Sequence, residues 1–126
     1  MLKLLVIGLG GFLGAVARYG LSGLVQRQTN ASFPTGTLAV NALGCLVIGC
    51  LMCLVEEREF LTPTARLFLL VGLLGSFTTF STLGYETFEF LRAGDWRMAA
   101  VNTLANVLLG FVAVMLGWFG AKTVGI

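Results

Sequence analysis

The run from Gly72 to Glu86 holds the residues of this chain whose types and spacing could do chemistry. It reads Gly-Leu-Leu-Gly-Ser-Phe-Thr-Thr-Phe-Ser-Thr-Leu-Gly-Tyr-Glu, so hydroxyls, glycines and one carboxyl interrupt an apolar segment. A membrane helix that is broken by glycine and lined with Ser and Thr exposes backbone carbonyls and hydrogen-bond donors at mid-bilayer depth. Such a backbone is tolerated only against protein or a water-filled cavity. The run therefore predicts the working part of a pore or transporter.

Within this run, Thr78, Thr82 and Glu86 are spaced at i, i+4 and i+8 and form one polar stripe. A stripe of hydroxyls that ends in a carboxyl could be a conduction track. Alternatively, Ser and Thr hydroxyls bond the carbonyl four residues earlier in their own helix. The number of hydroxyls beside the Gly-x-x-Gly break favours the track. Glu86 lies either at the interface or in a buried place where it shifts toward its neutral form.

Two further segments carry amides inside apolar sequence. Thr37 and Asn41 share a face of one segment, and Asn102, Asn106 and Gly110 form a stripe on another. An Asn inside a membrane helix is costly without a partner. Asn41 either bonds across helices as structural glue or donates its amide to a permeating anion. Spacing alone favours glue.

The first segment contains Gly8-Leu-Gly-Gly-Phe-Leu-Gly14. This is not a dinucleotide-binding motif, because the next acid is Glu56 and no alternation of strands and helices follows. Gly10-x-x-x-Gly14 instead predicts close helix packing in lipid. Arg18, near the end of the segment, either snorkels to the interface or lines an anion vestibule.

The composition predicts an all-α integral membrane protein. The chain has 126 residues, of which 57% are hydrophobic and 11% charged, whereas soluble domains carry about 25% charged residues. Four apolar stretches of about 20 residues would use most of the chain. We expect a single four-helix transmembrane domain over residues 1–126, with the third helix broken mid-membrane. The spans are predicted near residues 2–25, 37–55, 65–91 and 98–118.

The basic residues of this chain do not favour one orientation of the protein in the membrane. Four spans place four basic residues on each side of the membrane, and such a balance permits insertion in both directions. An antiparallel, dual-topology homodimer is therefore possible. One side holds Lys3, Arg58, Arg66 and Lys122, and the other Arg18, Arg27, Arg92 and Arg97.

Three segments together resemble the Fluc (CrcB) fluoride channels. They are Gly11-Phe-Leu-Gly-Ala-Val-Ala-Arg-Tyr, Gly36-Thr-Leu-Ala-Val-Asn-Ala-Leu-Gly and Gly72-Leu-Leu-Gly-Ser-Phe-Thr-Thr-Phe-Ser-Thr, and they occur in the family's order over nearly the whole chain. The resemblance implies antiparallel dual-topology homodimers in the cell inner membrane. Each dimer would hold two fluoride pathways and a structural Na⁺, and would export cytoplasmic fluoride passively.

The resemblance also implies roles for single residues. The backbone carbonyls of Gly75 and Thr78 would hold Na⁺, and we expect Gly75 to supply the unusual φ/ψ of the helix break. Asn41 would donate a hydrogen bond to fluoride, and Phe80 would present its positive ring edge. The remaining pathway residues would be Thr37, Ser81, Thr82 and Glu86, with Arg18 at a vestibule.

The chain departs from the family's pattern at two positions. Leu83 stands in the pathway where the family usually has a second phenylalanine, so one aromatic edge is missing. Gly110 falls where the family commonly has a serine, and Asn106 could compensate one turn earlier.

Other classes of protein fit less well. A small dual-topology multidrug exporter needs a carboxylate in its first helix to exchange protons, and the first span has none. A structural membrane subunit does not need the polar stripe. An enzyme is not expected, because the chain has no histidine and no nucleophile beside a base. We expect no nucleic-acid partner.

Overall fold

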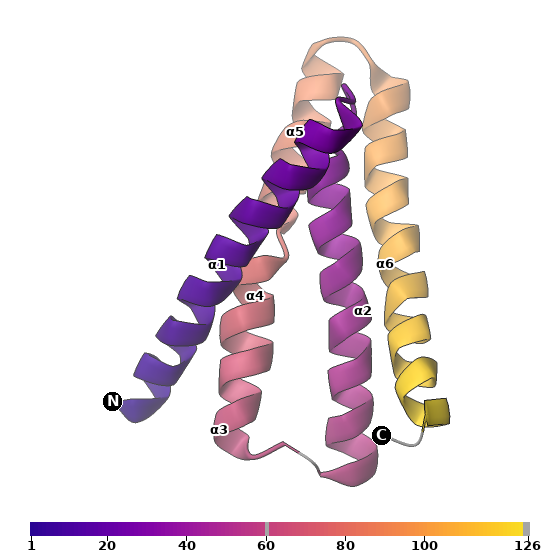
Figure 1. Cartoon of the computed structure of the whole chain (residues 1–126). Helices are drawn as coiled ribbons and strands as arrows, with labels where there is room; N and C mark the ends of the chain where they lie inside the picture. Colours follow the sequence, from indigo (N-terminus) through magenta and orange to yellow (C-terminus); the bar gives the residue numbers. More distant parts are fainter. Residues whose placement is uncertain (60, 125–126) are drawn as a thin grey trace.

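A computed structural model describes residues 1–59 and 61–124 as a set of long helices (Figure 1). No strand occurs among these residues. The third span is assembled from four short pieces, because its helix contains a π-helical stretch and then a break. The elements are α1 (Leu2–Thr29), α2 (Thr35–Arg58), α3 (Pro63–Arg66), the π-helix η1 (Leu67–Leu74), α4 (Gly75–Phe77), α5 (Phe80–Arg92) and α6 (Trp96–Val124).

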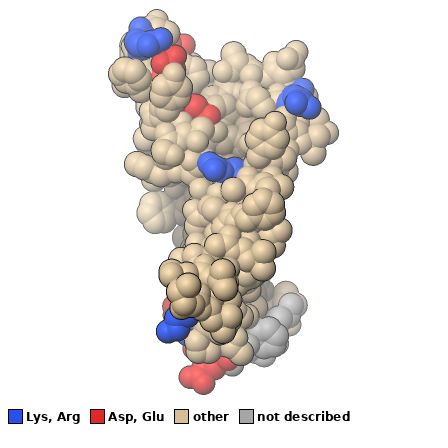
Figure 2. All heavy atoms as spheres, turned by 90° about the vertical axis from the view of Figure 1, so that its left-hand side faces the viewer, with Lys and Arg blue, Asp and Glu red and all other residues tan. Residues whose placement is uncertain are grey.

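The structure confirms the prediction of four membrane-spanning helices. Within the described part of the chain, four helical stretches are long and apolar enough to cross a membrane: Leu2–Thr29, Thr35–Glu57, Pro63–Arg92 and Trp96–Val124. Each contains one of the predicted spans. Figure 2 shows one face of the molecule, on which charged side chains gather toward the two ends and leave an uncharged band between them.

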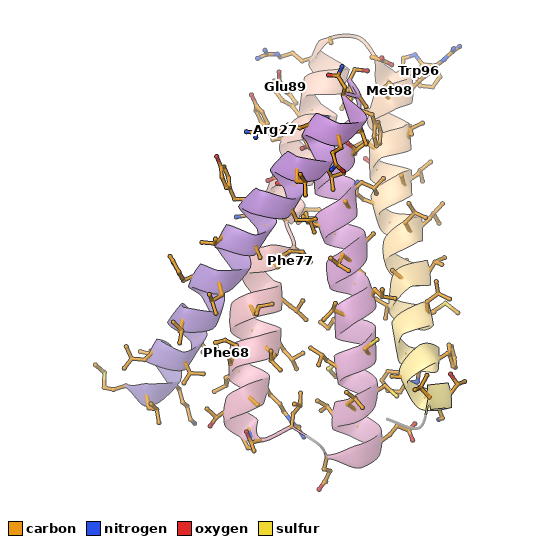
Figure 3. All side chains as sticks on the ribbon, viewed as in Figure 1. Arg27, Phe68, Phe77, Glu89, Trp96 and Met98 are labelled. Atoms are coloured by element: carbon orange, nitrogen blue, oxygen red, sulfur yellow. The ribbon has the colours of Figure 1, made fainter. Side chains whose placement is uncertain are left out.

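The long helices enclose a small apolar core. Helix α2 packs along α6, and α1 crosses the third span obliquely and packs against η1 (Figure 1). The core's central cluster of buried side chains consists of Val40, Leu74 and Phe77. Most other large apolar side chains point outward (Figure 3). This is the distribution expected of helices whose outer faces meet lipid or another membrane protein.

Glycines allow the close approach of α1 to the third span. A Cβ built on Gly14 would overlap the Leu73 carbonyl oxygen, and one on Gly10 would come within 2.5 Å of the Phe68 carbonyl oxygen. The prediction that Gly10 and Gly14 serve close helix packing is therefore confirmed. Small residues take this role in membranes because lipid supplies no hydrophobic force between helices, so association depends on contact.

Replacement of Gly14 by alanine should destabilise the fold. The added methyl group must displace backbone at the α1–η1 crossing, and such overpacking costs about 1–3 kcal/mol. The measurement is the free energy of unfolding in mixed micelles. The matched control is Gly11→Ala on the same helix, where a Cβ meets no atom within 4 Å. Equal stability of the two variants would contradict the packing role of Gly14.

Candidate ion pathway

The third span breaks at Thr78 and Thr79. The helix ends at Phe77, and both threonines have extended backbone, with φ −83° and ψ 157° at Thr78 and φ −147° and ψ 117° at Thr79. Helix α5 then begins at Phe80. The Thr79 side chain caps it, since its Oγ1 accepts a hydrogen bond of 3.2 Å from the Thr82 N–H.

The break frees two backbone carbonyls. In a continuous helix the Thr79 N–H would donate to the Gly75 carbonyl, but here it donates to Asn41 Oδ1 at 2.8 Å. Likewise the Thr82 N–H would donate to the Thr78 carbonyl, but donates to the Thr79 hydroxyl. Among the hydrogen bonds of the described residues, neither the Gly75 nor the Thr78 carbonyl is an acceptor.

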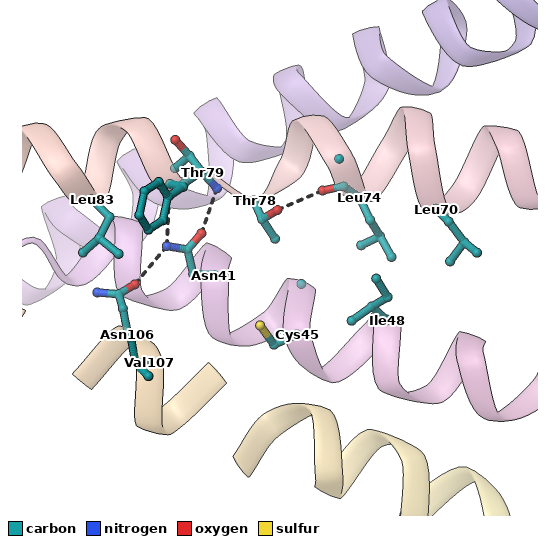
Figure 4. A pocket seen from close by; sticks show the side chains of 13 residues that line it. Asn41, Cys45, Ile48, Leu70, Leu74, Thr78, Thr79, Leu83, Asn106 and Val107 are labelled. Atoms are coloured by element: carbon teal, nitrogen blue, oxygen red, sulfur yellow. Dashed lines mark hydrogen bonds between the residues drawn. The ribbon is translucent and has the colours of Figure 1, made fainter. Parts of the chain in front are cut away.

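Asn41 on α2 pairs with both backbone groups of Thr79 (Figure 4). Its Nδ2 donates to the Thr79 carbonyl at 3.2 Å and to Asn106 Oδ1 at 2.9 Å, while its Oδ1 accepts from the Thr79 N–H. Both Asn41 N–H groups are therefore engaged within the chain. An anion could receive a hydrogen bond from Asn41 only if it replaced one of these two acceptors.

The asparagines of α6 extend this network away from the break. Asn106 Nδ2 donates to the backbone carbonyl of Asn102 at 2.9 Å and to its side-chain Oδ1 at 3.3 Å. Asn102 Nδ2 donates in turn to the hydroxyl of Thr87 on α5 at 3.2 Å. Asn102 is fully buried and Asn106 is 7% exposed. Burial excludes most water, so these amides must form their hydrogen bonds with protein groups.

A cavity of about 370 Å³ lies beside the break. Its lining unites residues of α2, the third span and α6 (Figure 4). Phe80 is 85% exposed on the outside of the chain, whereas Leu83 is only 7% exposed. Five of the predicted site residues line this cavity: Asn41, Gly75, Thr78, Phe80 and Leu83.

The other predicted site residues lie outside this cavity. Arg18, Thr37 and Thr82 line a second cavity of about 260 Å³. Glu86 lines a third, of about 430 Å³, toward the end of the molecule. Ser81 is exposed, and its hydroxyl lies 3.4 Å from that of Thr79.

A hydrogen bond of 2.5 Å from the Thr37 hydroxyl to Glu86 Oε1 connects the second and third cavities. The other oxygen of this carboxyl, Oε2, is buried and has no hydrogen-bond partner in the described part of the chain. Thr37 and Glu86 are therefore a contacting pair, with one carboxyl oxygen left for a further partner.

Thr79 is the residue that the sequence interpretation missed. It lines both of the first two cavities, caps α5 and carries the backbone groups that Asn41 binds. A threonine directly before a helical stretch is a common N-cap signal, and this signal could have selected it. Asn106 and Asn102 were recognised as a stripe, and Asn106 as a residue that could compensate for the family's serine, but neither was included among the predicted site residues.

The expectation that Gly75 supplies the unusual backbone of the break is wrong. Gly75 has helical dihedrals, φ −60° and ψ −31°, and the extended residues come three positions later. Asn41 Oδ1 and the Thr79 hydroxyl oxygen replace the helical carbonyls as acceptors for the N–H groups of Thr79 and Thr82. L-residues readily adopt the resulting extended conformation.

Gly75→Ala should therefore leave the fold intact. A Cβ at Gly75 would lie 3.7 Å from its nearest neighbour, the Leu70 carbonyl oxygen, and Ala is favoured over Gly in a helix by about 1 kcal/mol. Stability in micelles should be unchanged or slightly raised. Gly44→Ala is the contrasting variant, because its Cβ would overlap the Thr78 Cγ2. A large loss of stability of the single chain in Gly75→Ala would contradict the ordinary helical role assigned to Gly75.

Comparison with known proteins relates this chain to one family of membrane proteins. A family profile described as "CrcB-like protein, Camphor Resistance (CrcB)" matches residues 5–118. A protein of Nitrosococcus oceani named fluoride-specific ion channel FluC is 47% identical over 116 residues, which are 92% of this chain and 93% of the relative. A protein of the same name from Nitratidesulfovibrio vulgaris is 45% identical over 117 residues, or 93% of this chain and 94% of the relative. One from Chloroflexus aurantiacus is 42% identical over 125 residues, or 95% and 99% of the two chains.

Proposed function

The chain belongs to the CrcB family of multi-pass membrane proteins, and from this premise we propose that it is a fluoride-selective channel that exports cytoplasmic fluoride passively across the cell inner membrane. The observation that carries the proposal is the helix break at Thr78 and Thr79, which lies beside Asn41 and a cavity within a four-span protein. Its relatives are named as ion channels. Those names do not favour a multidrug exporter or an enzyme.

The break supplies what a small anion needs. Helix α5 starts at Phe80 within the third span, so its N-terminus places a positive partial charge and backbone N–H groups inside the membrane. Fluoride is strongly hydrated, and a pathway must replace its water with donors. The donors proposed here are the Asn41 amide and the hydroxyls of Thr37, Ser81 and Thr82.

Aromatic contact would come from Phe80. The edge of its ring carries the positive end of the quadrupole, so it can contact an anion without holding it tightly. Leu83 lines the same cavity but has no quadrupole. The proposed pathway therefore depends on one ring edge per chain at this level. Arg18, half-buried beside the second cavity, would favour entry of the anion.

A structural Na⁺ is the proposed cofactor, and the donor set fits it. The free carbonyls of Gly75 and Thr78 are hard oxygen donors, which suit an alkali cation. The Thr78 hydroxyl donates to the Leu74 carbonyl at 3.1 Å, so the backbone oxygen is the group left for an ion. Two carbonyls from each of two chains would bind the cation and hold the chains together.

An antiparallel homodimer is the proposed assembly. Phe80 is 85% exposed and Gly75 is exposed as well, so the cavity beside the break opens toward the outside of the chain. A second copy would close it. The equal division of basic residues between the two sides of the membrane permits that copy to insert upside down.

Fluoride efflux from liposomes tests the function, and Asn41→Asp tests the site. The purified protein should release fluoride and retain chloride. The aspartate keeps an acceptor for the Thr79 N–H but loses both donors and adds negative charge. Efflux should therefore fall by at least about 100-fold, equivalent to roughly 2.7 kcal/mol in the barrier.

The control for Asn41→Asp is the same change at Asn30, an exposed residue at the end of α1, which should keep normal efflux. An Asn41→Asp rate within about twofold of wild type, roughly 0.4 kcal/mol, would assign Asn41 to packing alone. No fluoride efflux from the wild-type protein would refute the channel function itself.

Reporters fused to the C-terminus test the orientation. One reporter is active only in the cytoplasm and the other only outside it, and both should give signal in cells. Two or three lysines added to the loop after α5 should shift the signal to one side and lower fluoride export, because the charge balance no longer permits both orientations. Signal from a single reporter in the unmodified protein would contradict dual topology.

A further inference from the structure

The asparagine pair on α6 lies behind the residue that holds the break. Asn41 is fixed at Thr79 by two hydrogen bonds, and its third goes to Asn106 Oδ1 at 2.9 Å. These hydrogen bonds form a continuous network that runs from the break through α2 to α6. We propose that Asn106 is a positioning residue, which sets the orientation of the Asn41 carboxamide and thereby keeps the backbone open at Thr79.

The orientation of the Asn106 amide follows from its surroundings. Its Nδ2 faces the carbonyl and the side-chain oxygen of Asn102, at 2.9 and 3.3 Å. Both are acceptors, so the amide nitrogen must point toward them. The oxygen of Asn106 is then left facing Asn41, where only a donor is accommodated. Asn106 is 7% exposed, so exchange of this partner for water is disfavoured.

The orientation of the Asn41 amide is also constrained by the backbone of Thr79. The Thr79 N–H requires an acceptor, and the Thr79 carbonyl requires a donor. Only one orientation of the Asn41 amide satisfies both groups of Thr79 and the oxygen of Asn106. Without Asn106 one Asn41 N–H loses its acceptor, and the carboxamide gains freedom to turn. The Thr79 N–H then spends more time without its acceptor.

The same network reaches α5 a second time. Asn102 Nδ2 donates to the Thr87 hydroxyl at 3.2 Å, and Thr79 caps the beginning of that helix. Helix α5 is thus connected to the α6 asparagines near its N-terminus and again two turns later. A shift of α5 along its axis would disturb both contacts, so α6 fixes the position of the half-helix.

This inference rests on the proposed channel function, but its first measurement needs no fluoride. The exchange rate of the Thr79 amide proton, observed by NMR in ¹⁵N-labelled protein in micelles, reports whether Asn41 still accepts it. In Asn106→Leu this rate should rise about two- to tenfold, as expected for loss of a hydrogen bond of ordinary strength. Fluoride efflux should fall by a similar factor.

Two further variants sharpen the test. Asn106→Ala removes the amide without added bulk, and should give the same result if the leucine variant fails to fold. Thr123→Val is the matched control, because the Thr123 side chain is on α6, is exposed and donates to the Gly120 carbonyl of its own helix at 3.0 Å. It should change neither the Thr79 exchange rate nor the efflux.

The outcomes separate the two proposals. An unchanged Thr79 exchange rate in a folded Asn106 variant overturns the positioning role. A raised rate with unchanged efflux supports the positioning of Asn41 by Asn106 and overturns its link to conduction. A wild-type protein that carries no fluoride refutes the channel function, while the exchange rates still decide whether Asn106 holds the break.

Discussion

The hydrogen bonds between Asn41 and Thr79 are the interaction on which the site depends. A helix that opens inside a membrane leaves backbone groups without water, and each unsatisfied group costs several kcal/mol. Asn41 offers an acceptor to the Thr79 N–H and a donor to its carbonyl. A side-chain amide can do both at once, which a hydroxyl or an apolar side chain cannot do with the same reach. The break is therefore stable because α2 carries an amide at this depth.

The remainder of α2 is arranged so that Asn41 can reach the break. One turn further on, Gly44 leaves room for the Thr78 methyl group, and Gly49 admits the backbone of α6 at Val114. At the start of the helix, Gly36 faces the Ser22 carbonyl of α1. Three glycines thus bring three different neighbours against one central helix. In lipid such contacts replace the hydrophobic force that would assemble a soluble core.

The sequence predicted the spans, the packing glycines and the stretch that holds the break, because each of these depends on local composition or spacing. It could not predict which groups meet across helices. Asn41 and Asn106 are 65 positions apart, and their contact depends on how α2 and α6 are aligned. The position of the break was also beyond local rules. Gly75 is the more flexible residue, but among the described residues the displaced N–H groups that find side-chain acceptors are those of Thr79 and Thr82. The availability of hydrogen-bond partners, and not the backbone flexibility of glycine, determines where this helix opens.

The helix break explains how a cation and an anion could both bind near the same part of the third span. In a continuous helix the dipoles of successive peptide groups are compensated by their neighbours, so only the two ends carry partial charge. Opening the helix at Thr78 and Thr79 creates a new negative end at the carbonyls of Gly75 and Thr78, and a new positive end at the start of α5. Both ends lie in a medium of low dielectric, where uncompensated partial charges are costly. A cation at the first and a small anion near the second would each lower that cost. The chain thus needs no buried charged side chain at the break to attract either ion.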